Sequence, residues 1–124
     1  MTGQELLNTA LLLMGYTDQN GEPDTEIARA AMRMGLTAIR QIYAELAYAR
    51  GETPKDIASL GEIIPLPDRL LTEVMPYGVA MLLAIIEGDN NSEAAFSLIY
   101  NRKRRLLTAT DNRVDTLPRL YAED

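Results

Sequence analysis

The chain has 124 residues, no cysteine, no histidine and a net charge of −6 at pH 7. A domain of this length can bury a hydrophobic core without covalent cross-links. Without cysteine or histidine it cannot form a disulfide, a serine–histidine or cysteine–histidine catalytic centre, or a zinc site of the usual kind. We therefore expect one domain that is not an enzyme and needs no cofactor or metal.

The charge is distributed unevenly along the chain. Residues 1–90 hold 6 basic and 13 acidic side chains, a balance of −7, whereas residues 91–124 hold 6 basic and 5 acidic, a balance of +1. An acidic body repels nucleic acid and anionic lipid. The longest uncharged apolar stretch, Val74–Ile86, is too short to span a bilayer. We expect neither membrane association nor sequence-specific DNA binding.

The first helix is expected to begin at a capping box. Thr2 and Glu5 have the spacing at which a threonine hydroxyl and a glutamate carboxylate satisfy free backbone N–H groups. Gly15 is the residue type that most often follows the end of a helix. Residues 16–23 are rich in turn-forming residues, so they predict a loop.

A long central helix is expected from Asp24, as its N-cap, to Arg50. Its polar residues follow one narrow stripe, so its apolar arc is much wider than a surface helix needs. Such a helix is either surrounded by its own domain or packs in part against a neighbouring subunit. The arginines of the polar stripe are candidates for an inter-subunit or charged contact: Arg29, Arg33 and Arg40.

A loop and a proline-interrupted helix are expected in the middle of the chain. Residues 51–66 contain two glycines and two prolines, which favour a long loop. Its apolar residues should tuck onto the core, and the last two of them could instead form a short strand: Ile57, Leu60, Ile63 and Ile64. Helices should follow at 68–74 and 76–87, bent at Pro76 and buried all round over Tyr77–Ile86.

The last helix should run from Ser92 to about Leu107, with Ala95, Phe96, Ile99, Tyr100, Leu106 and Leu107 facing inward. Residues 108–124 are expected as an extended arm of the same single domain, which orders on a partner or is a frayed terminus. Polar and apolar residues alternate in this arm, and its candidate partner-binding residues are Arg113, Val114, Asp115, Leu117, Pro118, Arg119 and Tyr121. The predicted class is all-α, a four- to five-helix bundle over residues 1–107 that carries this arm.

Two charged clusters have a structural and a functional interpretation. The basic run 102–105 either contacts phosphate or a partner, or complements the dipole at the C-terminal end of a helix. Its candidates for an inter-subunit or charged contact are Arg102, Arg104 and Arg105. The acidic residues Glu87, Asp89 and Glu93 lack the spacing of a calcium-binding loop, so we interpret them as a solvated turn.

Part of the chain resembles a known family. The residues that carry the resemblance lie between Leu66 and Pro118: Met75-Pro76-Tyr77-Gly78-Val79-Ala80 with Leu82-Leu83-Ala84, then Glu87-Gly88-Asp89, then Phe96, Tyr100-Asn101 and Lys103-Arg104. This pattern is similar to head–tail connector proteins of tailed phages and prophages.

The resemblance implies a small helical protein that assembles as a homo-oligomeric ring of about a dozen copies. Such a ring sits beneath the phage portal protein, extends the DNA channel and docks the next tail-side connector protein. DNA passes through it without sequence-specific binding. The protein would lie at the head–tail interface of the virion, and in the host bacterial cytoplasm during assembly. Residues 113–121 would contact the portal and the loop at 51–66 the tail side.

Two alternatives remain from the sequence. The first is a small helical regulatory or adaptor protein that binds a single protein partner. The second is a nucleic-acid-binding protein that uses residues 102–105, whose binding would weaken with salt.

Overall fold

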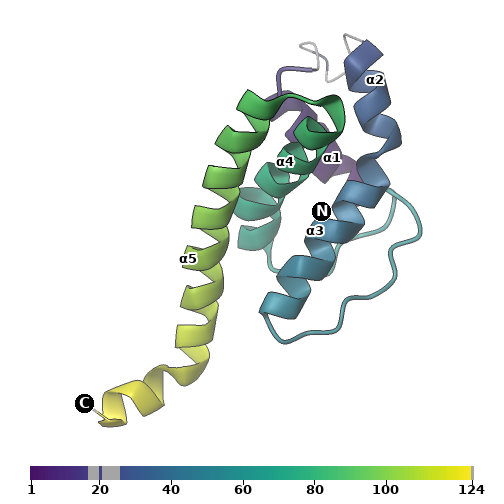
Figure 1. Cartoon of the computed structure of the whole chain (residues 1–124). Coiled ribbons are helices and arrows are strands. Elements are labelled where there is room, and N and C mark those ends of the chain that lie inside the picture. Colours follow the sequence, from purple (N-terminus) through teal and green to yellow (C-terminus); the bar gives the residue numbers. More distant parts are fainter. Residues whose placement is uncertain (17–19, 21–25, 124) are drawn as a thin grey trace.

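The chain is mostly helical, and no strand occurs among the residues that its computed structural model describes, namely 1–16, 20 and 26–123, with the side chains of 27, 28 and 108–123 left out. The order of the elements is α1 (Gly3–Leu13), α2 (Glu26–Arg33), α3 (Gly35–Ala49), a π-helical turn η1 (Leu70–Val74), α4 (Met75–Glu87) and α5 (Asn90–Glu123). Helix α4 lies between α5 and the other helices (Figure 1). This agrees with the predicted all-α class.

Helix α1 begins as its sequence predicts. The Glu5 N–H donates to the Thr2 hydroxyl at 3.2 Å, and the Thr2 N–H donates to the Glu5 carboxylate at 3.0 Å. The hydrogen bond from the Thr2 N–H to the carboxylate holds the pKa of Glu5 below its usual value. Gly15, just after the helix, adopts a left-handed φ of +75°, which a residue with a side chain rarely does. The capping box and the role of Gly15 are therefore confirmed.

The single helix expected from Asp24 to Arg50 is wrong, because the chain leaves the helix at Met34 and forms α2 and α3 instead. Gly35, at the start of α3, lies directly on α1, where an added β-carbon would collide with Leu7 Cδ2. The break at Met34 lies next to this contact. Asp24, the expected N-cap, lies outside the described residues.

The segment between α3 and η1 closes over the start of α1. The Gly3 N–H donates to the Glu62 carbonyl at 3.1 Å, and the Gln4 N–H to the Leu60 carbonyl at 2.8 Å. Ile57 and Ile64 are buried, as expected, whereas Ile63 is 71% exposed. A single antiparallel bridge joins Ile63 to Thr2, so the alternative of a short strand at 63–64 does not form in the described chain.

Helix α4 supplies the centre of the core. A π-helical turn precedes it, in which the Met75 N–H bonds to the Leu70 carbonyl five residues back. Pro76 lies next to this turn in the first turn of α4, the part of a helix in which proline is best tolerated. Leu70–Glu87 is long and apolar enough to cross a membrane by length and composition alone, and 56% of it is buried inside the fold.

The expectation that Tyr77–Ile86 is buried all round is wrong at its end. Ile85 and Ile86 are 52% and 47% exposed. They lie in the last turn of α4, just before Gly88, which adopts a left-handed φ of +72° and ends the helix. The chain reverses direction directly after this turn, and none of the described helices covers it.

Helix α5 follows after a two-residue turn and is longer than expected. The Asp89 carboxylate accepts a hydrogen bond from the Ser92 N–H at 3.0 Å, which caps the helix and lowers the pKa of Asp89. The helix continues to Glu123, so the extended arm predicted at 108–124 is wrong for residues 108–123. Val114, Leu117 and Tyr121 are also spaced as on one helical face, and a helix already formed extends at little cost. Within the last helix, Ala95 and Leu106 are exposed rather than inward-facing.

Helices α4 and α5 meet at a very close contact. A β-carbon on Gly78 would lie 2.7 and 2.9 Å from two atoms of the Tyr100 ring and 3.0 Å from Ile42 Cδ1. Tyr100 is 1% exposed and is among the largest fully buried side chains of the core. Interiors packed to this density have no free volume for another carbon atom. The absence of a side chain at Gly78 is therefore what lets α5 lie on α4.

Gly78→Ala should lower the free energy of unfolding by about 1–3 kcal/mol, because the added methyl group forces Tyr100 or Ile42 to move. Urea denaturation followed by circular dichroism measures the change. The matched control is Gly61→Ala in the loop, where the nearest atom is 3.8 Å away and little change is expected. Equal stability of the two variants would contradict the close contact.

Candidate interaction surface

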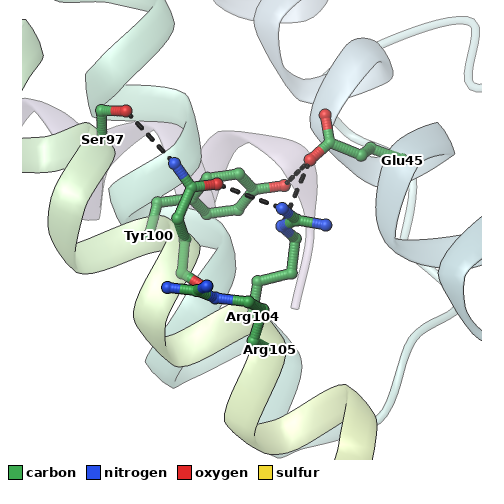
Figure 2. A network of polar contacts seen from close by, with 6 residues as sticks. Glu45, Ser97, Tyr100, Arg104 and Arg105 are labelled. Atoms are coloured by element: carbon green, nitrogen blue, oxygen red, sulfur yellow. Dashed lines mark hydrogen bonds and ion pairs between the residues drawn. The ribbon is translucent and has the colours of Figure 1, made fainter.

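A polar network joins α3 to α5 at the edge of the core. The Tyr100 hydroxyl donates to Glu45 Oε1 at 2.7 Å, and Arg104 Nε lies 3.5 Å from the same carboxylate oxygen. Arg104 also donates to the Asn101 side-chain carbonyl at 3.1 Å, and the Asn101 amide donates to the Ser97 hydroxyl at 3.3 Å (Figure 2). The network fixes the rotation of α5 about its own axis.

The network favours a neutral tyrosine. Burial raises the pKa of Tyr100, and the hydrogen bond to Glu45 raises it further. The Arg104 guanidinium carbon lies 5.7 Å from the centre of the Tyr100 ring, close enough for a cation–π contact. Tyrosine in this state donates a hydrogen bond and stays protonated, so the arrangement is structural and not suited to proton transfer near neutral pH.

Most of the basic run is used inside the molecule. Lys103 Nζ lies 5.3 Å from the centre of the Tyr77 ring, and Arg104 pairs with Glu45. Arg105 Nε donates to the Asn101 carbonyl at 3.2 Å, although the side chain itself is exposed. Arg102 is exposed as well. Two of the four cations therefore contact the body of the molecule while still partly exposed, and Arg102 and Arg105 are the exposed ones.

The outward side of α5 carries these two arginines among apolar residues. Leu98 and Leu106 are 61% and 62% exposed, and Arg102 and Arg105 lie between them. Spacings of four, three and one residues place all four on one side of the helix. We call these residues the α5 outer stripe: Leu98, Arg102, Arg105 and Leu106.

A second exposed surface lies where α1 and α4 end. Leu12, Leu13, Ile85 and Ile86 are exposed there, and Glu87 and Asp89 follow the two isoleucines. Burial raises the pKa of Tyr16, and the charges of Asp89 and Glu87 raise it further. Helices α1 and α4 pack on each other and end at the same end of the fold (Figure 1). Glu93 follows in the first turn of α5. We call this surface the acidic end: Leu12, Leu13, Ile85, Ile86, Glu87 and Glu93.

The candidate residues from the sequence fall in three places. Arg29 and Arg33 are exposed on α2, and Arg40 on α3 donates from Nε to the Ile57 carbonyl. Arg102, Arg104 and Arg105 are described above. The backbone of α5 carries the predicted partner-binding residues, whose side chains are outside the described part of the chain: Arg113, Val114, Asp115, Leu117, Pro118, Arg119 and Tyr121.

Sequence reasoning missed Glu45, which anchors the α3–α5 network. The signal was incomplete, because a buried tyrosine indicates that its hydroxyl has a partner but not which residue supplies it. Among the described side chains, no group of three acidic residues is placed to hold a metal ion.

Comparison with protein-family models, with curated proteins and with solved structures finds no match to this chain.

Tyr100→Phe should lower the free energy of unfolding by about 1–2 kcal/mol, because it removes a hydrogen bond to a charged but partly exposed carboxylate. A double-mutant cycle with Glu45→Ala should give a coupling of at least about 0.5 kcal/mol. Tyr48→Phe is the control, since that side chain is 65% exposed. Additive effects of Tyr100→Phe and Glu45→Ala would contradict the network.

Proposed function

We propose that this chain is a structural virion protein, a head–tail connector that assembles as a ring beneath the portal protein. In this role the ring extends the DNA channel and docks the next tail-side connector protein. The proposal includes the finer arrangement expected from the sequence, a four- to five-helix bundle with a kink at Pro76. It also includes the expected location at the head–tail interface of the virion.

The observation that supports the proposal most directly is the length and position of α5. The helix has 34 residues, its first part packs on α4 and η1, and its C-terminal turns lie apart from the other helices (Figure 1). The backbone of α5 therefore extends beyond the helices of its own domain. Such a helix is the kind of element that one subunit of an assembly presents to another.

The exposed apolar side chains also favour assembly. Among the described residues, nine large hydrophobic side chains are exposed: Leu12, Leu13, Met34, Tyr48, Ile63, Ile85, Ile86, Leu98 and Leu106. Complete burial of one leucine or isoleucine contributes about 1.5–3 kcal/mol. Burial of several offsets an association cost of about 4–15 kcal/mol. A regulatory protein with one partner needs a single exposed apolar surface, whereas these nine exposed side chains lie on several elements.

The distribution of charge favours a channel through which DNA passes without being bound, over a protein that binds a specific DNA sequence. Residues 1–90 have a balance of −7, and a negative surface does not hold a polyanion. Lys103 and Arg104 are held by Tyr77 and Glu45. The basic run therefore lacks the single basic face that a nucleic-acid-binding helix needs.

The proposal predicts that the purified chain, alone or mixed with the portal protein of the phage or prophage that encodes it, forms rings. Native mass spectrometry across concentration gives the subunit number, and negative-stain imaging shows the shape. Rings that bind portal are the expected result. A monomer or dimer without affinity for portal would contradict the proposal and favour the single-partner adaptor. Salt-dependent DNA binding lost on neutralising residues 102–105 would favour nucleic-acid binding instead.

A further inference from the structure

We propose that copies of this chain associate head to tail, with the α5 outer stripe of one copy seated on the acidic end of the next. The inference rests on the proposed function, because it names the two surfaces through which the ring closes. It commits to one partner for both surfaces, a second copy of this chain.

The two surfaces are alike in apolar content and opposite in charge. The α5 outer stripe places Arg102 and Arg105 between two exposed leucines. The acidic end places Glu87 next to Ile85 and Ile86, at the same end as the exposed leucines of α1. An apolar contact flanked by opposite charges is the usual arrangement of a specific protein interface.

The fold leaves the charges of Arg102 and Glu87 available, and Arg105 is exposed although its Nε donates to the Asn101 carbonyl. Within the basic run, the Lys103 ammonium lies over the Tyr77 ring and the Arg104 guanidinium pairs with Glu45. Neither charge therefore points away from the body of the molecule. On the acidic end, Asp89 is occupied by the hydrogen bond from Ser92. The Glu87 side chain forms no hydrogen bond or ion pair with the described residues. Guanidinium groups suit such a carboxylate because they can bind it with two parallel hydrogen bonds.

Charge also decides how the copies are oriented. A symmetric dimer through the α5 outer stripe would bring the Arg102 and Arg105 side chains of both copies together, and one through the acidic end would bring carboxylates together. Only contact between the two different surfaces pairs opposite charges. An interface between different surfaces of identical subunits is heterologous, and it closes into a ring when the rotation between neighbours permits.

Charge reversal tests the pairing. One variant reverses the stripe (Arg102→Glu with Arg105→Glu), and a second reverses the acidic end (Glu87→Lys with Glu93→Lys). Sedimentation velocity at physiological ionic strength, with portal protein added if the wild-type chain alone is monomeric, should show at least a tenfold loss of self-association for each variant. Circular dichroism and thermal melting establish that both variants fold.

Mixing provides the decisive measurement. A 1:1 mixture of the two variants should assemble again, because each reversed surface then meets a complementary one, and a chain with all four substitutions should assemble alone. The matched control is Lys55→Glu with Arg69→Glu, which changes the net charge as much as the stripe variant but lies on neither surface. It should assemble as the wild type does.

Three results would contradict the contact between the α5 outer stripe and the acidic end. They are a wild-type chain that stays monomeric with and without portal, reversed variants that assemble normally, or folded variants whose mixture fails to assemble. The proposed function fails differently. Rings that obey the charge rules but ignore the portal protein would refute the connector role and leave the head-to-tail interface standing.

Discussion

The contact between Gly78 and the Tyr100 ring is the constraint on which the rest of the structure depends. It brings α5 so close to α4 that a single β-carbon would not fit between them. At that distance the Tyr100 hydroxyl reaches Glu45 on α3, so one side chain ties three helices together. Arg104, one turn further along α5, then meets the same carboxylate. The position of α5, and with it the direction of every side chain that α5 presents to solvent, follows from this contact.

The same contact divides the basic run into a structural half and an exposed half. Because Tyr100 faces the core, residues three and four positions later face Tyr77 and Glu45. Arg102 and Arg105 must then point away from the body, next to Leu98 and Leu106. An interface built from those residues needs no change of conformation, since the monomer already presents them.

The sequence predicted the beginnings and ends of elements best where local chemistry decides them. The Thr2–Glu5 capping box and the left-handed Gly15 act over a few residues, and each formed where its pattern indicated. The break at Met34 could not be predicted in this way, because the contact beside it, between Gly35 and Leu7, joins two residues far apart in the chain. The apolar pattern of residues 24–50 is equally compatible with one helix or with two that share an axis.

The exposed surfaces were hidden from sequence reasoning for the same reason. Ile85 and Ile86 continue the apolar pattern of a buried helix, and only the reversal of the chain at Gly88 leaves them uncovered. For residues 108–123 the local pattern was misleading, because alternating polar and apolar residues suggested an extended arm where the backbone is helical. An alternation over a few residues fits a strand and also one face of a helix, so length and neighbouring structure decide between them.

The central claim is that the α5 outer stripe of one copy contacts the acidic end of another. The chain has no cysteine, so a single introduced cysteine reports one position without background. We would mix Leu98→Cys with Ile86→Cys and treat the mixture with a short bifunctional maleimide, then identify the products by mass spectrometry. The account predicts mostly mixed 98-to-86 cross-links and few between identical positions. A predominance of 98-to-98 or 86-to-86 products, or no cross-link between copies, would contradict it.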